Sequence, residues 1–107
     1  MPQKYEPDSN VVTETEPRTK LKRPNLYKVL LHNDNYTTRE FVVAILKEVF
    51  RKSEQDAVQI MLHVHYNGIG VAGVYTYEVA ETKVKIVEAA AKDNGFPLRL
   101  SMEPEEG

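Results

Sequence analysis

The sequence predicts a small α+β domain with the element order β-α-α-β-α-β. Two short apolar stretches, 26–32 and 69–75, have the length and content of strands. A third, at 98–103, alternates apolar and polar residues with the period of a half-buried strand. Apolar residues at helical spacing between these stretches predict three helices. This order favours a sandwich in which the helices cover one face of a short sheet.

Residues 1–25 have the composition of a flexible extension. They hold four of the six prolines and only scattered apolar residues, which leaves little to bury against the entropy of ordering. We therefore expect an extension over 1–25, a core domain over 26–103 and a short C-terminal tail over 104–107.

The first helix is expected to follow a polar turn at 33–35, whose side chains can bond their own backbone. Residues 37–40 form a potential capping box, in which Thr37 would accept the amide hydrogen of Glu40. The helix should run to about Lys52. Its apolar face comprises Phe41, Val42, Ile45, Leu46 and Val49.

The second helix is expected to start at Ser53 and to end at Gly68, where a left-handed residue fits readily. Thr76 can cap the third helix, and Gly95 should stop it. The expected buried residues are Ala57, Ile60, Met61 and Val64 in the second helix, and Val79, Ala80, Val84, Ile86 and Val87 in the third.

Composition excludes several functional classes. The chain has no cysteine, so disulfides, thiolate nucleophiles and Cys-ligated zinc are excluded. Its net charge of −2 provides no overall attraction to nucleic acid or anionic membranes. No apolar run approaches the roughly 18 residues of a transmembrane helix, and the N-terminal region does not resemble a secretory signal or a transit peptide. We expect a bacterial cytoplasmic protein, with the plastid stroma as the less favoured alternative.

Residues 68–73 read GIGVAG and match the dinucleotide-binding fingerprint. That fingerprint needs a strand before it and a helix after it, so that the pyrophosphate meets the helix N-terminus. Here the predicted order is reversed. We therefore reject nucleotide binding and interpret the glycines as positions of tight turning or close backbone approach.

Other chemical motifs are equally weak. His63 and His65 resemble a metal pair, but residues two apart on a helix project to different faces. No serine lies in a nucleophile elbow, and Glu78 and Glu81 share one helix surface instead of facing each other across a cleft. We expect neither an enzyme nor a bound metal or cofactor.

A basic cluster at 18–23 allows a second interpretation. Its four cations, Arg18, Lys20, Lys22 and Arg23, could form the arm of a nucleic-acid- or ribosome-associated module. No aromatic residues are interleaved for base stacking, so a solvated hinge explains the cluster better. We keep the binding module as the alternative function.

The polar turn at 33–35 has a functional interpretation if it lies beside the second helix. Met61, Val64 and His65 would then join an apolar hollow to acceptors suited to an ammonium group. A turn with capping side chains explains the same residues, and periodicity alone does not place the two elements together.

Three stretches, LYKVLLHNDNYTTREFVVAILKEVF, MLHVHYNG and GVYTYEVAETKV, resemble the ClpS family of Clp protease adaptors. The resemblance covers Leu26 to about Met102. It implies a monomer with a three-stranded antiparallel sheet packed on three helices. It also implies binding of proteins whose N-terminal residue is large and hydrophobic (an N-degron). Such cargo would be delivered to the N-domain of an AAA+ unfoldase, ClpA or a ClpC-like relative.

The resemblance also implies roles for individual residues. Asn33 and His65 would bond the α-amino group of the cargo, with Asp34 and Asn35 beside them. Thr37 would contact the peptide backbone, and the extension before Leu26 would take part in delivery. The side-chain pocket would comprise Leu31, Val42, Met61, Val64 and Leu98, and the unfoldase-docking surface Glu78 and Lys83.

Two positions depart from the family pattern. Asn35 stands where a second aspartate is usual, which removes a charge that would attract the ammonium. Arg39 stands where most members have a methionine that gates the pocket. Both departures make the site more positive, so the range of N-terminal residues that this chain accepts is expected to differ from the usual one.

Overall fold

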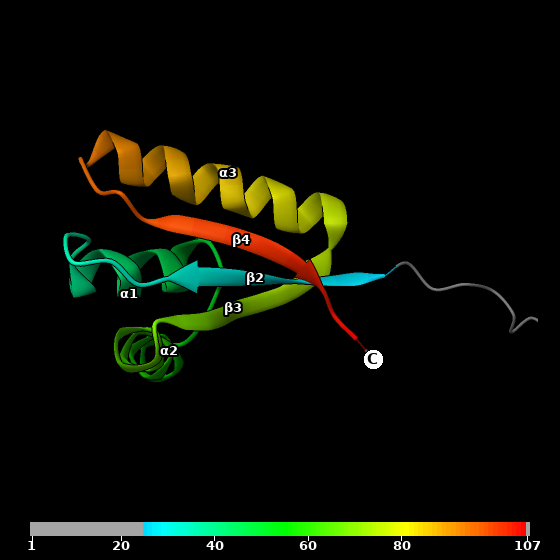
Figure 1. Cartoon of the computed structure of the whole chain (residues 1–107), viewed down its shortest axis with the longest axis horizontal. Coiled ribbons are helices and arrows are strands. Elements are labelled where there is room, and N and C mark those ends of the chain that lie inside the picture. The colour runs from blue at the N-terminus through cyan, green and yellow to red at the C-terminus, as the bar shows by residue number, and fades with distance from the viewer. Residues whose placement is uncertain (1–24, 107) are drawn as a thin grey trace, which may run out of the picture.

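The computed structural model describes residues 25–106, which fold into three strands and three helices (Figure 1). The elements are β2 (Leu26–His32), α1 (Arg39–Glu48), α2 (Glu54–Asn67), β3 (Ile69–Thr76), α3 (Tyr77–Asp93) and β4 (Arg99–Pro104). The predicted order β-α-α-β-α-β is confirmed. None of the helices in this part of the chain is long and apolar enough to cross a membrane.

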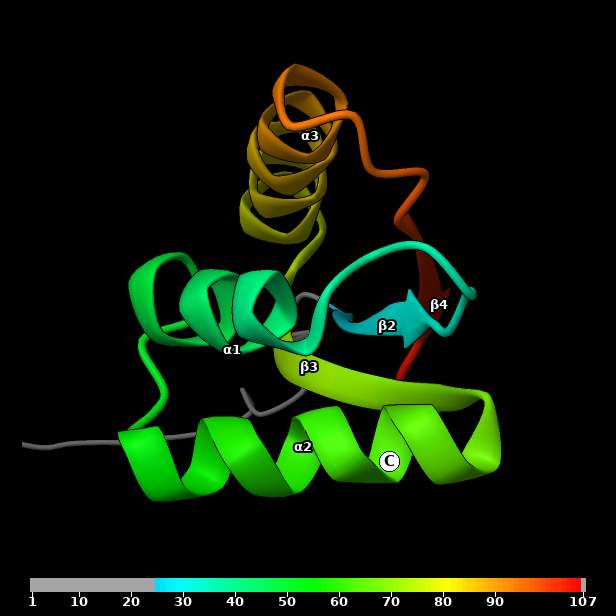
Figure 2. The same ribbon diagram turned by 90° about the vertical axis from the view of Figure 1, so that its left-hand side faces the viewer.

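The sheet has the order β3-β2-β4, and both pairings are antiparallel. The central strand β2 pairs along its whole length with β3, from Leu26 opposite Thr76 to His32 opposite Ile69. The three helices are arranged around one side of this sheet (Figure 2). This confirms the predicted α+β sandwich with a three-stranded antiparallel sheet.

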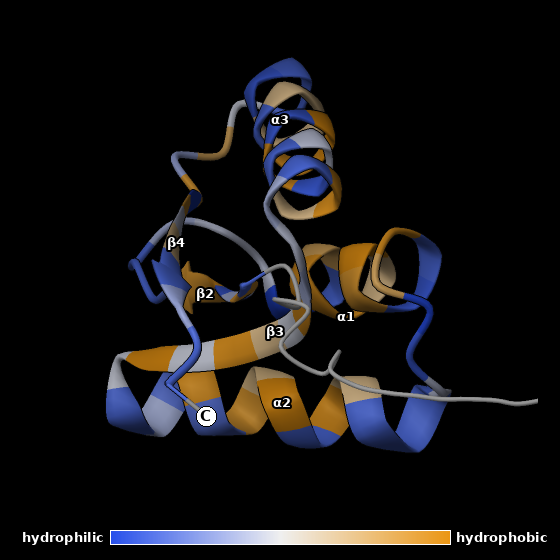
Figure 3. Ribbon diagram, turned by 90° about the vertical axis from the view of Figure 1, so that its right-hand side faces the viewer, coloured by the Kyte–Doolittle hydropathy of each residue, from blue (hydrophilic) through white to orange (hydrophobic). Residues whose placement is uncertain are grey.

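The hydrophobic core lies between the sheet and the helices. Figure 3 shows strongly hydrophobic segments on β2, β3 and α1. The largest fully buried side chains are Leu31 and Val29 from β2, Leu46 from α1 and Val87 from α3. Burying each such side chain contributes roughly 1.5–3 kcal/mol. The two strand residues and the two helix residues therefore stabilise the core by similar amounts.

The start and end of α1 differ from the sequence prediction. Thr38, not Thr37, is the N-cap, and its hydroxyl accepts the Phe41 amide hydrogen at 3.1 Å. Thr37 is unavailable for this role because it bonds Asp34 instead. The helix ends at Glu48, four residues early, since the chain reverses through Arg51 with a φ of 58°.

The boundaries of α2 are as predicted. The Ser53 hydroxyl accepts the Asp56 amide hydrogen at 3.1 Å at the start of the helix. Gly68 ends it in the left-handed conformation, with a φ of 89° that favours glycine. The Ser53 cap and the left-handed Gly68 each act within one turn of the chain, so neither depends on tertiary contacts.

The buried face of α3 was predicted only in part. Ala80, Val87 and Ala91 are buried, whereas Val79 and Ile86 are 44% and 50% exposed. The buried residues lie seven and four positions apart on one helical stripe, and each exposed residue precedes a buried one by one position. Thr76 precedes the helix as predicted but makes no side-chain capping bond.

The glycines of β3 serve close packing, as predicted. A Cβ at Gly70 would lie 2.7 Å from Cγ2 of Val64 on α2, far inside normal contact distance. The order of elements, with α2 before and β3 after the glycine run, is incompatible with a dinucleotide fingerprint.

The outer edge of strand β4 is only partly available for pairing with a further strand. The Leu100 amide donates to Oε2 of Glu88 on α3 at 3.2 Å, which ties the strand to the helix. Near the other end of β4, Pro104 has no amide hydrogen to donate. Edge strands in natural sheets are commonly blunted by such features.

Candidate functional site

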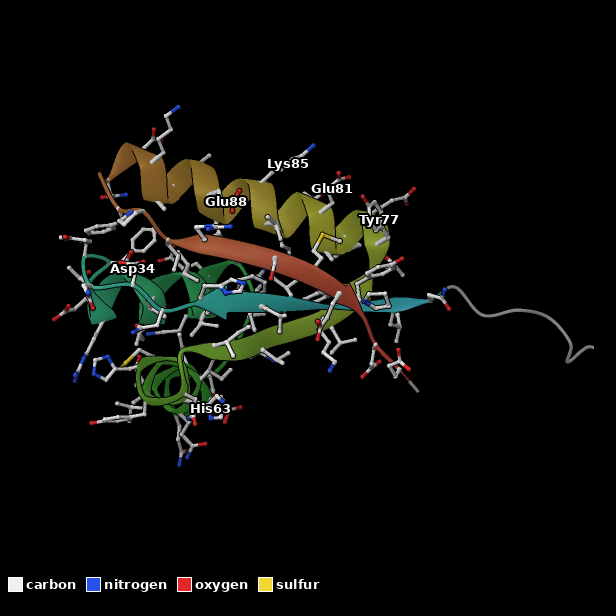
Figure 4. The ribbon with its side chains drawn as sticks, viewed as in Figure 1. Asp34, His63, Tyr77, Glu81, Lys85 and Glu88 are labelled. Carbon is white, nitrogen blue, oxygen red and sulfur yellow. The ribbon has the colours of Figure 1, made fainter. Side chains whose placement is uncertain are left out.

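A cavity of about 190 Å³ opens at one end of the molecule, where β2 runs into α1. Asp34 marks this end in Figure 4. Its lining residues are Asn33, Asp34, Asn35, Thr37, Arg39, Val42, Met61, Val64 and His65. The structure therefore brings together the polar turn, the start of α1 and the C-terminal half of α2. All nine are residues that the sequence analysis assigned to the site.

The polar turn is fixed by its own hydrogen bonds. The Asp34 carboxylate accepts the amide hydrogens of Tyr36 and Thr37 at 2.8 and 2.7 Å, and the Thr37 hydroxyl at 2.8 Å. The Asn33 amide donates to the Gly68 carbonyl at 2.9 Å and so links the turn to the end of α2. This hydrogen bond holds the polar turn next to the C-terminal end of α2.

Asp34 supplies a negative charge to the cavity at neutral pH. Its partial burial disfavours ionisation, but the hydrogen bonds from Thr37 and Tyr36 outweigh this effect and hold the pKa of the carboxyl below its ordinary value. The carboxylate is therefore ionised at neutral pH. Its oxygens accept hydrogen bonds from the turn and so stabilise the loop. The carboxylate can still attract a cation in the cavity electrostatically.

Arg39 and His65 meet at the rim of the cavity. Nη2 of Arg39 lies 3.1 Å from Nε2 of His65. A guanidinium can only donate, so Nε2 is the acceptor in this contact. His65, which the resemblance assigns to the cargo ammonium, thus contacts a cation of the protein itself, the Arg39 guanidinium.

The apolar wall consists of Val42 from α1 with Met61 and Val64 from α2, all buried. Leu31 and Leu98 were expected in the pocket, but the structure places them in the hydrophobic core and not among the lining residues. Met61 gives the apolar wall some adaptability because its unbranched side chain can adopt several shapes.

The chemistry of the site is that of binding. It joins an apolar hollow to a carboxylate, two amides and an imidazole, a combination suited to an ammonium beside an apolar side chain. His63 and His65 do not act together: His63 faces Asn67, one turn along the helix, at 3.2 Å. Among residues 25–106 no group of acidic or histidine side chains could hold a metal ion.

The two predicted docking residues differ in their surroundings. Glu78 is exposed in the first turn of α3, at the end of the molecule opposite Asp34, where Figure 4 labels its neighbour Tyr77. Lys83 is half-buried. Its Nζ donates to the Val49 carbonyl at 2.7 Å, at the C-terminus of α1, and lies 5.1 Å from the ring centre of Tyr75. The basic cluster at 18–23 lies outside the described residues.

The sequence model of a known family, described as ATP-dependent Clp protease adaptor protein ClpS, matches residues 22–101. The chain belongs to the ClpS family. ClpS proteins are adaptors of the Clp protease, so this chain is an adaptor and not an enzyme.

Individual ClpS proteins agree closely with the chain. The ClpS of Myxococcus xanthus (strain DK1622) is 78% identical over 107 residues, which is all of both chains. The ClpS of Desulfatibacillum aliphaticivorans is 62% identical over 91 residues, 85% of this chain and 88% of that protein. The solved structure of Agrobacterium tumefaciens ClpS2 bound to L-phenylalaninamide is 48% identical, with a TM-score of 0.75 over 78% of this chain and 100% of that one. The chain therefore has the ClpS fold and is an adaptor of the Clp protease.

Proposed function

We propose that the cavity captures the N-terminal residue of a cargo protein when that residue is large and hydrophobic. The observation that carries the proposal is the cavity itself, in which one apolar wall faces a rim of ammonium acceptors. The ligand described for Agrobacterium tumefaciens ClpS2, L-phenylalaninamide, is consistent with it, since that molecule combines a free amine with one large apolar side chain.

Within this proposal the roles divide by chemistry. Asn33 and His65 accept hydrogen bonds from the α-amino group, with Asp34 and Asn35 providing negative potential and a further acceptor. Thr37 contacts the backbone of the cargo. The apolar wall holds its side chain. Arg39 at the rim narrows or shifts the range of N-terminal residues that the cavity accepts, because it adds a cation where the cargo also carries one.

The expected affinity suits an adaptor that must release its cargo. Burial of one Leu or Phe side chain contributes roughly 1.5–3 kcal/mol, and each hydrogen bond to the charged amine roughly 1.5–3 kcal/mol. After the loss of translational and rotational freedom, two or three such contacts give a Kd of roughly micromolar size. An internal amide carries no positive charge, so the site selects chain termini.

Delivery is the second half of the proposal. Glu78 and Lys83 form the surface that docks on the N-domain of an AAA+ unfoldase, ClpA or a ClpC-like relative, and residues 1–25 assist the transfer. Glu78 lies at the opposite end of the molecule from Asp34, so cargo and unfoldase can be bound by one monomer at the same time. We place this activity in a bacterial cytoplasm.

The capture step is tested by titrating the full chain with peptides that begin with Leu, Phe, Tyr, Trp, Ile or Ala, each free and N-acetylated. We expect binding of the free peptides with large N-terminal residues and a loss of at least about tenfold on acetylation, since acetylation removes the charge. Equal affinity for free and acetylated Phe peptides would contradict the proposal. Docking is tested separately, with the isolated N-domain of the unfoldase and the Glu78→Arg variant.

A further inference from the structure

A second hollow, a groove of about 460 Å³, runs between α1 and α2, and seven of its nine lining residues have no role in the function proposed above. The two helices pack side by side and run in opposite directions (Figure 2). The groove is lined by Arg39, Glu40, Val43, Ala44, Lys47, Glu48, Glu54, Val58 and Met61. Its α1 residues follow one helical stripe, and Glu54, Val58 and Met61 follow a matching stripe on α2.

The groove lies next to the capture cavity. Arg39 and Met61 line both hollows, so the two share a wall. Because the helices are antiparallel, the start of α1 lies beside Met61, and the end of α1 lies beside the start of α2. The Lys47–Glu54 ion pair joins the helices at that far end.

The charge of the groove is unbalanced. Three carboxylates, Glu40, Glu48 and Glu54, face two cations, Arg39 and Lys47. Both cations are engaged: Lys47 bonds Glu54, and Arg39 bonds His65 in the capture cavity.

Two further carboxylates of the groove lie along α1. Within residues 25–106, Glu40 and Glu48 make none of the side-chain hydrogen bonds or ion pairs of the structure. Along the α1 stripe they lie one turn before and one turn after Val43 and Ala44, which contribute the apolar floor together with Val58. A chain lying in the groove would therefore meet an apolar floor between two negative charges.

We propose that the groove holds the cargo segment that follows the captured N-terminal residue and that it favours lysine or arginine in that segment. Glu40 and Glu48 are eight residues apart on one helix, or about 12 Å. An extended chain at about 3.3 Å per residue covers that length in about four residues. The preferred basic position therefore lies within about the first five residues of the cargo. This inference rests on the proposed capture function.

The test separates the groove from the cavity by the length of the ligand. L-Phenylalaninamide can fill only the capture cavity, whereas an octapeptide with N-terminal Phe can reach the groove. We would measure the Kd of both for the full chain and for Glu48→Lys and Val58→Lys. Glu106→Lys, an exposed acid in the C-terminal segment, is the matched charge-reversal control. A lysine would also be moved through positions 2–8 of an otherwise alanine octapeptide.

We expect a lysine within positions 2–5 to tighten octapeptide binding by about three- to fivefold over a lysine at position 8, as is usual for one exposed ion pair. Glu48→Lys should abolish that preference, and Val58→Lys should weaken octapeptide binding by about fivefold or more. Binding of L-phenylalaninamide should be unchanged in both variants. Glu106→Lys should change neither ligand.

Other outcomes would overturn the inference in distinguishable ways. If the groove variants leave the octapeptide unaffected while L-phenylalaninamide binds normally, the cargo does not lie in the groove and the capture function stands. If L-phenylalaninamide and the Phe octapeptide both fail to bind the unaltered chain, the capture function fails and this inference fails with it. If Glu48→Lys or Val58→Lys instead changes the sedimentation of the chain alone, the groove belongs to a contact between two copies.

Discussion

Arg39 Nη2 lies 3.1 Å from His65 Nε2, so a cation of the protein contacts one imidazole nitrogen of a residue that lines the cavity. Under the proposed capture function, a cargo ammonium that approaches His65 has to displace the guanidinium or share the site with it. The two cations repel each other, and the field of Asp34 attracts both. We therefore expect the guanidinium to compete with the cargo amine.

Arg39→Met should relieve this competition. We expect N-terminal Phe and Leu peptides to bind more tightly, by about threefold to tenfold, and the range of accepted N-terminal residues to broaden. Titration of the peptide panel measures both effects. Lys85→Met, which removes an exposed cation from α3 (Figure 4), should leave the panel unchanged. An unchanged panel for Arg39→Met would mean that the guanidinium does not influence the cavity.

Thr37→Val should raise the pKa of Asp34. The substitution removes the hydroxyl bond but retains the amide bond to the carboxylate, so part of the effect that lowers this pKa is lost. NMR titration of the Asp34 carboxyl carbon measures the shift. Thr38→Val is the control, since it should reduce helix capping by about 1 kcal/mol while leaving the Asp34 pKa in place.

The same pair of variants tests the pH dependence of stability. The pKa of Asp34 is lowered on folding, so the stabilisation from its ionised form is present above the pKa of the unfolded chain and is lost as the pH falls through the folded pKa. Asp34 is only half-buried, so solvent screening limits the contribution to about 0.5 kcal/mol. It should be smaller in Thr37→Val, as urea unfolding at pH 7 and at pH 3 would show.

Lys83→Met should destabilise the fold. The ammonium bonds the Val49 carbonyl at the end of α1 and lies over the rings of Phe50 and Tyr75. Its loss leaves that carbonyl without this partner, and we expect about 1–2 kcal/mol lower free energy of unfolding in urea. Lys85→Met should change stability by less than about 0.5 kcal/mol. Equal stability of the two variants would argue that Lys83 serves only the docking surface.

Gly70→Ala should disturb the apolar wall of the cavity through Val64. The new methyl group would press on Val64 Cγ2, and such overpacking destabilises by roughly 1–3 kcal/mol. Peptide affinity should fall in parallel, because Val64 lines the cavity. Adding Val64→Ala makes room for the methyl group, so the double variant should lose less stability than the sum of the single variants. Additive losses would place the strain elsewhere.

The parts of the fold that short-range chemistry determines were predictable from the sequence. Ser53 and Gly68 bound α2 as expected because each acts within one turn. Thr37 and Thr38 show the limit of such reasoning. Either can cap a helix, and the choice between them depends on Asp34, whose carboxylate takes the Thr37 hydroxyl and amide.

The candidate site was predictable in its members but not in its internal contacts. The family resemblance supplied all nine residues of the cavity, yet the Arg39–His65 contact joins positions 26 apart and has no signature in the local sequence. The groove was missed for a related reason. Its residues on α1 recur at helical spacing, but the sequence does not tell which stripe of α2 faces them.

The Glu88–Leu100 bond and Pro104 have a consequence for how this adaptor meets other chains. A protein that works beside polypeptides destined for degradation encounters many segments able to form β-structure. Strand addition to a sheet needs a row of free backbone donors and acceptors. On the β4 side, one donor is committed to a carboxylate and another is missing. Incoming chains therefore gain little from joining the sheet there, and recognition is left to side chains and to the chain terminus.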